Sequence, residues 1–111
     1  MSSGKCFDVW LTEADVRNSF HLTPVKERKK RGNIPRTGRW SPASLAICRT
    51  TQDKGWEVWD SMLVYHPSDD RHDYQSMLFF PIPAKLKQYI DMKIKGPFGF
   101  VVDTTRPLGG V

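Results

Sequence analysis

The sequence has little cysteine and no long apolar run. Cys6 and Cys48 are the only cysteines among 111 residues, too few for a disulfide framework or for a zinc site without histidine ligands. No stretch approaches the roughly 20 apolar residues that cross a bilayer, and the opening MSSGKCFDVW lacks the apolar core of a signal peptide. We therefore expect an intracellular protein, cytoplasmic or, in a eukaryotic host, nuclear, with both cysteines reduced and buried.

The sequence also lacks the common signatures of enzymes. It contains no Gly-x-Gly-x-x-Gly and no Gly-Lys-Ser or Gly-Lys-Thr phosphate loop, and no serine has the local context of a nucleophile. These absences favour a protein that is not an enzyme, and they imply no cofactor.

Hydrophobic residues make up 39% of the chain and aromatic residues 12%, which is too apolar for a disordered chain. A length of 111 residues is typical of one domain. We expect one compact domain over residues 1–103 and a flexible tail over residues 104–111.

Periodicity and turn residues predict an α+β fold, an antiparallel sheet of four or five strands with two short helices. Thr12 is a suitable cap for the first helix, which would end near His21. Pro83 precedes the second, over 84–93. The predicted strands cover residues 6–11, 43–51, 56–65, 74–80 and 98–102, the third of them bent near Asp60.

Positive charge is concentrated in one segment. Residues 26–39 hold seven of the 17 basic residues and one of the 12 acidic residues, so the segment carries +6 and the remaining chain −1. A nearly neutral domain with one basic segment indicates an anionic partner. Lysine and arginine that neutralise phosphates release counterions, which makes nucleic-acid binding strong at low salt.

The leading hypothesis is a small, non-enzymatic nucleic-acid-binding protein, for DNA or RNA, that uses a basic loop over residues 26–42. Five residues would contact phosphate, namely Lys26, Arg28, Lys29, Lys30 and Arg31. Arg36 and Arg39 would reach a groove or bases. Trp40 follows Arg39 directly and is the best candidate for stacking on bases.

The other three tryptophans have a simpler explanation, because indole rings contribute large apolar area to cores. We expect Trp10 and one of Trp56 and Trp59 to be buried. Alternation along a strand would place the second member of that pair on the less buried face.

Two other functions are compatible with the sequence. A regulator or inhibitor could bind an acidic or apolar protein surface, or form a homodimer. It would use an edge strand or an apolar patch provided by Met62-Leu63-Val64 or Met77-Leu78-Phe79-Phe80. A metal-dependent nuclease could use His66, Asp69, Asp70, His72 and Asp73, although their spacing matches no defined ligand pattern. The basic loop could also be merely solvated.

The N-terminal region carries one resemblance. Leu11-Thr12-Glu13-Ala14-Asp15-Val16, followed by His21-Leu22-Thr23-Pro24-Val25-Lys26, resembles the opening of plant B3-type DNA-binding domains, with a strand, a Leu-Thr-x-x-Asp-Val helix start and a Pro-Lys segment. The likeness covers about sixteen residues. The later Gly-Trp of that family is not in its usual order here, since Gly55-Trp56 opens a predicted strand. The resemblance implies DNA binding.

Overall fold

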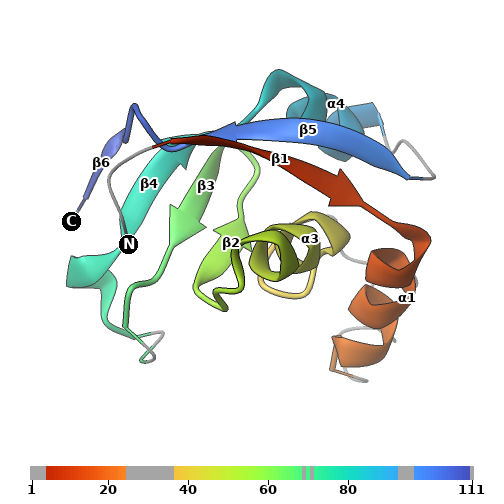
Figure 1. Ribbon diagram of the computed structural model, residues 1–111. Coiled ribbons are helices and arrows are strands. Elements are labelled where there is room, and N and C mark those ends of the chain that lie inside the picture. Colours follow the sequence, from red (N-terminus) through yellow and green to blue (C-terminus); the bar gives the residue numbers. More distant parts are fainter. Residues whose placement is uncertain (1–4, 25–36, 69, 71, 93–96, 111) are drawn as a thin grey trace.

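The computed structural model describes residues 5–24, 37–68, 70, 72–92 and 97–110 and shows an α+β fold with two antiparallel sheets (Figure 1). The first sheet joins β1 (Cys6–Leu11) to β5 (Phe98–Asp103). The second has the order β2-β3-β4-β6, with β2 over Trp56–Val58, β3 over Met62–Tyr65, β4 over Leu78–Pro81 and β6 over Gly109–Gly110. The predicted fold class is confirmed, although the strands form two sheets and not one.

One core fills the space between the two sheets and the helix α3 (Pro42–Thr51). The inner face of the first sheet contributes Val9, Leu11, Phe100 and Val102; α3 adds Ala43, Ala46 and Ile47; and the second sheet adds Trp56, Val58, Leu63 and Phe80. Complete burial of each large apolar side chain stabilises the fold by about 1.5–3 kcal/mol. The described segments therefore depend on one shared core.

The helix α1 (Glu13–Leu22) begins as predicted at Thr12. The hydroxyl oxygen of Thr12 accepts a hydrogen bond from the Asp15 N–H at 3.3 Å, and the Asp15 carboxylate accepts one from the Thr12 N–H at 2.8 Å. This reciprocal capping box satisfies two N–H groups that a helix start leaves unpaired. It fixes the direction in which the chain leaves β1.

The predicted strand over residues 43–51 is wrong, because this segment forms α3. Ser41 caps the helix by accepting a hydrogen bond from the Ser44 N–H at 3.2 Å, and Pro42 occupies the first turn. The hydroxyls of Thr50 and Thr51 donate to carbonyls one turn earlier, so these β-branched residues are accommodated in the last helical turn. The described residues thus include three α-helices, one more than predicted.

Two further predicted strands have different bounds. The segment 56–65 is a hairpin, in which β2 and β3 pair and the Trp59 N–H donates to the Met62 carbonyl at 2.9 Å. The segment 74–80 starts with a 3₁₀ turn, η1 (Tyr74–Ser76), before β4 begins. The helix α4 (Ala84–Met92) and strand β5 lie where they were predicted, within two residues.

The predicted tail contributes to the second sheet. Gly109 and Gly110 in β6 pair with Phe79 and Leu78, and the Leu108 N–H donates to the Phe79 carbonyl at 2.7 Å. No helix within the described ranges has the length and apolar character needed to cross a bilayer. Neither cysteine is in a disulfide. Cys48 is half-buried on α3, whereas Cys6 is exposed, contrary to the expectation that it is buried.

Candidate nucleic-acid interface

The structure describes the end of the predicted basic site. Arg39 and Trp40 lie in the loop that precedes α3. The other predicted site residues, Lys26, Arg28, Lys29, Lys30, Arg31 and Arg36, fall in the range 25–36, outside the described residues. The geometry of the site is therefore built from residue 37 onward.

Residues 37–41 are fixed to the second sheet. The Gly38 N–H donates to the Val58 carbonyl and forms an isolated antiparallel bridge beside β2. The hydroxyl of Ser41 donates to the Gly38 carbonyl at 3.0 Å while its oxygen caps α3. Gly38 has φ = +94°, a conformation that favours glycine. The loop therefore has a defined path between β2 and α3.

Trp40 is fixed by α1 from the opposite side. Its backbone carbonyl accepts a hydrogen bond from the hydroxyl of Ser19, a fully buried residue in the second turn of α1. The indole ring is half-buried, and the Cζ atom of Arg39 lies 4.6 Å from the ring centroid. Within this cation–π pair the exposed guanidinium retains N–H groups that can donate to a phosphate.

Arg39 also lines a polar hollow of about 400 Å³ with residues that follow α3 and β3, namely Gln52, Asp53, Lys54, Gly55, His66, Pro67 and Ser68. Lys54 is exposed and brings a second cation to this hollow. The sequence analysis missed Lys54, because 14 positions separate it from Trp40 and only the loop geometry brings its turn beside Arg39.

The acidic residue in the hollow is engaged by its neighbours. The Asp53 carboxylate accepts hydrogen bonds from the Gly55 N–H at 2.9 Å and from the Tyr65 hydroxyl. Burial first, and then the hydrogen bond and charge of Asp53, raise the pKa of Tyr65 to about 12. The hollow is thus lined by two cationic side chains, Arg39 and Lys54, and by one carboxylate, Asp53, which accepts two hydrogen bonds.

The described residues among those considered for a metal-dependent nuclease do not form a metal-binding group. The buried His66 ring contacts the Glu57 carboxylate through Nε2, while His72 stacks edge-on against Tyr74. The Asp70 carboxylate accepts a hydrogen bond from the His72 backbone N–H at 2.9 Å. In the part of the chain that the structure describes, which omits Asp69, no three such side chains form a metal-binding group.

The other tryptophans follow the predictions in part. Trp56 is 2% exposed and Trp59 is 38% exposed, so the two faces of their hairpin differ as expected. Trp10 is 57% exposed, which overturns the prediction that it is a core residue. It occupies the outer face of β1, whereas Val9 and Leu11 point to the core.

The apolar stretches considered for a protein partner lie inside the second sheet. β3 pairs with β2 on one side and β4 on the other, and β4 also pairs with β6. Leu63, Val64 and Phe80 are buried. β3 is therefore not an edge strand, and β6 pairs with Leu78 and Phe79 of β4. Binding of a partner through an apolar patch on either stretch stays a prediction.

Comparison with protein-family models, curated proteins and solved structures gives no significant match for this chain. The strand, the Thr12 cap and the helix that follow the B3-like pattern are present, but they are local features. A strand followed by a capped helix occurs in many folds. The function is therefore argued from the site alone.

Proposed function

We propose that this protein is a small, non-enzymatic nucleic-acid-binding protein. Segment 26–39 supplies the phosphate contacts, and the Arg39–Trp40 pair provides a stacking surface at the end of that segment. The observation that carries the proposal is the placement of the Arg39 guanidinium 4.6 Å from the Trp40 ring centroid, in a loop fixed by Gly38, Ser41 and Ser19.

The chemistry of this pair supports a nucleic-acid ligand. An unpaired base can stack on an arginine plane or on an aromatic ring, and the arginine edge can donate to a phosphate. Lys54 adds positive charge on the hollow beside Arg39. A solvated loop would need neither the anchoring of its backbone nor the alignment of its cation with an aromatic ring.

The test is fluorescence anisotropy with labelled single- and double-stranded oligonucleotides over a range of salt concentrations. The Lys29→Ala/Lys30→Ala/Arg31→Ala variant should weaken binding and reduce the slope of log K against log salt by roughly 2–3, since each phosphate contact contributes about 0.7–0.9. A matched control, Arg17→Ala/Lys87→Ala/Arg106→Ala, removes the same charge elsewhere and should change the slope much less.

Substitutions at Arg39 test the stacking. Arg39→Lys keeps the charge but loses the planar group, so it should weaken binding to single strands nearly as much as Arg39→Ala. Negligible binding by the native protein at low salt would contradict the proposal. Equal losses in the two triple variants would attribute binding to net charge, and not to segment 26–39.

A further inference from the structure

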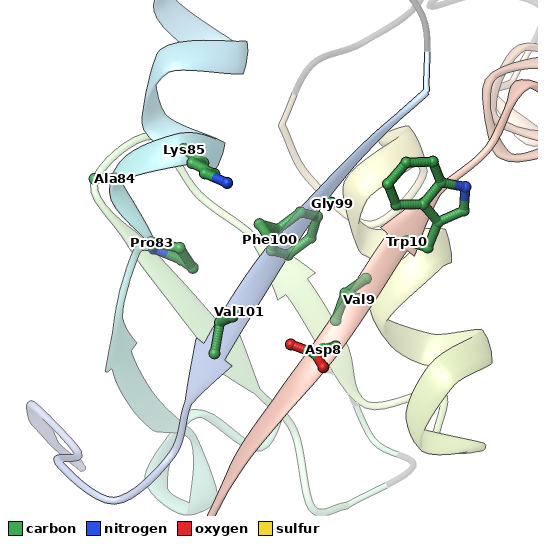
Figure 2. A pocket seen from close by; sticks show the side chains of 9 residues that line it. All are labelled: Asp8, Val9, Trp10, Pro83, Ala84, Lys85, Gly99, Phe100 and Val101. Atoms are coloured by element: carbon green, nitrogen blue, oxygen red, sulfur yellow. The ribbon is translucent and has the colours of Figure 1, made fainter.

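A second hollow lies on the outer face of the first sheet, away from the core (Figure 2). Its volume is about 700 Å³, within the usual range for small-molecule sites. It is lined by β1, β5 and the first turn of α4, through Asp8, Val9, Trp10, Pro83, Ala84, Lys85, Gly99, Phe100 and Val101. We call this hollow the outer trough.

Trp10 is held in place at one side of the outer trough by a glycine. Trp10 and Gly99 are cross-strand partners in the β1–β5 pair. A Cβ on Gly99 would lie 3.0 Å from Cε3 and 3.1 Å from Cζ3 of the indole, so the absence of a side chain there lets the ring lie over β5. One face of the ring lies against Gly99 in β5, and the residue is still more than half exposed. It is therefore a fixed aromatic surface that is open to a ligand.

A cationic group lies on the opposite wall. Lys85 is exposed in the first turn of α4, and Figure 2 shows its side chain directed toward the trough. The same turn places the positive end of the α4 dipole at this wall. Val101 continues the apolar floor, and Asp8 is the acidic residue of the lining. An aromatic wall facing a cationic wall across an apolar floor matches the two ends of a nucleotide.

We propose that the outer trough is a second subsite for single-stranded nucleic acid, in which an unpaired base stacks on Trp10 and a phosphate contacts Lys85. This inference rests on the proposed function and adds strand selectivity to it. Bases of a duplex are stacked within the helix and do not reach a flat ring of this kind, whereas unpaired bases do. A protein segment in the trough would instead cover Asp8 and Lys85, and charged residues are depleted in the centres of protein interfaces.

The experiment compares a single-stranded oligonucleotide, the same strand with abasic sites, and a blunt-ended duplex of two complementary strands. Trp10→Leu should weaken binding to the intact single strand roughly 5- to 150-fold, and Trp10→Tyr should restore much of it. Gly99→Ala should act in the same direction, because its methyl group would displace the ring. Trp59→Leu is the matched control, since it removes an exposed tryptophan from the turn between β2 and β3.

The abasic strand and the duplex separate stacking from charge. With either probe, Trp10→Leu and the native protein should bind equally. Lys85→Ala should weaken binding to both the intact and the abasic strand, because phosphates remain in each. Lys87→Ala, two positions along the same helix and paired with Asp91 at 3.1 Å, should have little effect.

Several outcomes would overturn the inference. Equal binding of the single strand by native protein and folded Trp10→Leu would exclude stacking in the trough, while a normal response to the Lys29–Arg31 triple variant would leave the proposed function intact. Loss of self-association in Trp10→Leu, measured by sedimentation, without a change in oligonucleotide binding would assign the trough to a protein contact. Failure of the native protein to bind any probe would overturn both proposals.

Discussion

The guanidinium of Arg49 on α3 lies 2.8 Å from the carboxylate of Asp15, which completes the capping box with Thr12 in the first turn of α1. The same guanidinium donates to the carbonyl of Trp10 at 2.8 Å. Arg49 thereby joins the end of β1, the start of α1 and the last turn of α3. The Asp15 side chain is 6% exposed and that of Arg49 is 52% exposed, so the carboxylate is largely removed from water while the guanidinium is half solvated.

Replacing Asp15 by alanine should lower the free energy of unfolding by about 2 kcal/mol, because it leaves the Thr12 N–H without its acceptor and removes the capping box. Arg49→Ala should cost about 1 kcal/mol or less, since its side chain is half in solvent. Urea unfolding with an unchanged m-value measures both. A larger loss in Arg49→Ala than in Asp15→Ala would contradict this assignment.

Gly38→Ala should destabilise the protein by about 1–2 kcal/mol, through its positive φ alone. Apart from its chain neighbours, no atom of the described residues lies within 4 Å of the added Cβ, so they contribute no steric clash. Gly55→Ala is the comparison, because there the Cβ would lie 2.4 Å from the backbone carbonyl oxygen of His66. Thermal unfolding of both variants should show the larger loss for Gly55→Ala, and the reverse order would rule out this explanation.

Tyr65 should make stability depend on pH in the alkaline range. Burial raises the pKa of Tyr65 to about 12 in the folded protein, above its ordinary value of 10. The contribution of the protonated Tyr65 hydroxyl to folding stability is therefore fully present below pH 10 and decreases as the pH rises through 12. Urea midpoints measured from pH 9 to 12 should fall for the native protein. Tyr65→Phe should show a shallower fall, and identical pH profiles would contradict a raised pKa of Tyr65 in the folded protein.

Local signals in the sequence predicted part of the fold. Thr12 and Asp15 carry a cap that requires only four residues, and Leu86, Tyr89 and Ile90 follow the spacing of a single helical face. The segment 43–51 carries conflicting signals. Ile47, Thr50 and Thr51 favour a strand, whereas the Ser41-Pro42 start signal favours a helix. Burial of Ala43, Ala46 and Ile47 on one face decided between them.

The candidate site was predictable only in its charge. Segment 26–39 is visible as a run of basic residues, but the alignment of Arg39 with Trp40 depends on Ser19, which lies 21 positions before Trp40. The exposure of Trp10 depends on its register with Gly99 in a strand near the other end of the chain. Long-range register of this kind is set by the pairing of whole strands, and no short window of sequence contains it.

The pairing of β1 with β5 also determines when the first sheet can form during protein synthesis. Lys5 and Thr104 exchange hydrogen bonds across a separation of 99 positions, with the Lys5 N–H donating at 2.8 Å and the Thr104 N–H at 3.0 Å. Among the described strands, β1 therefore has no pairing partner until β5 has also been synthesised. Contacts this distant in sequence slow folding, so the first sheet, and the outer trough that it carries, can form only after translation has passed β5.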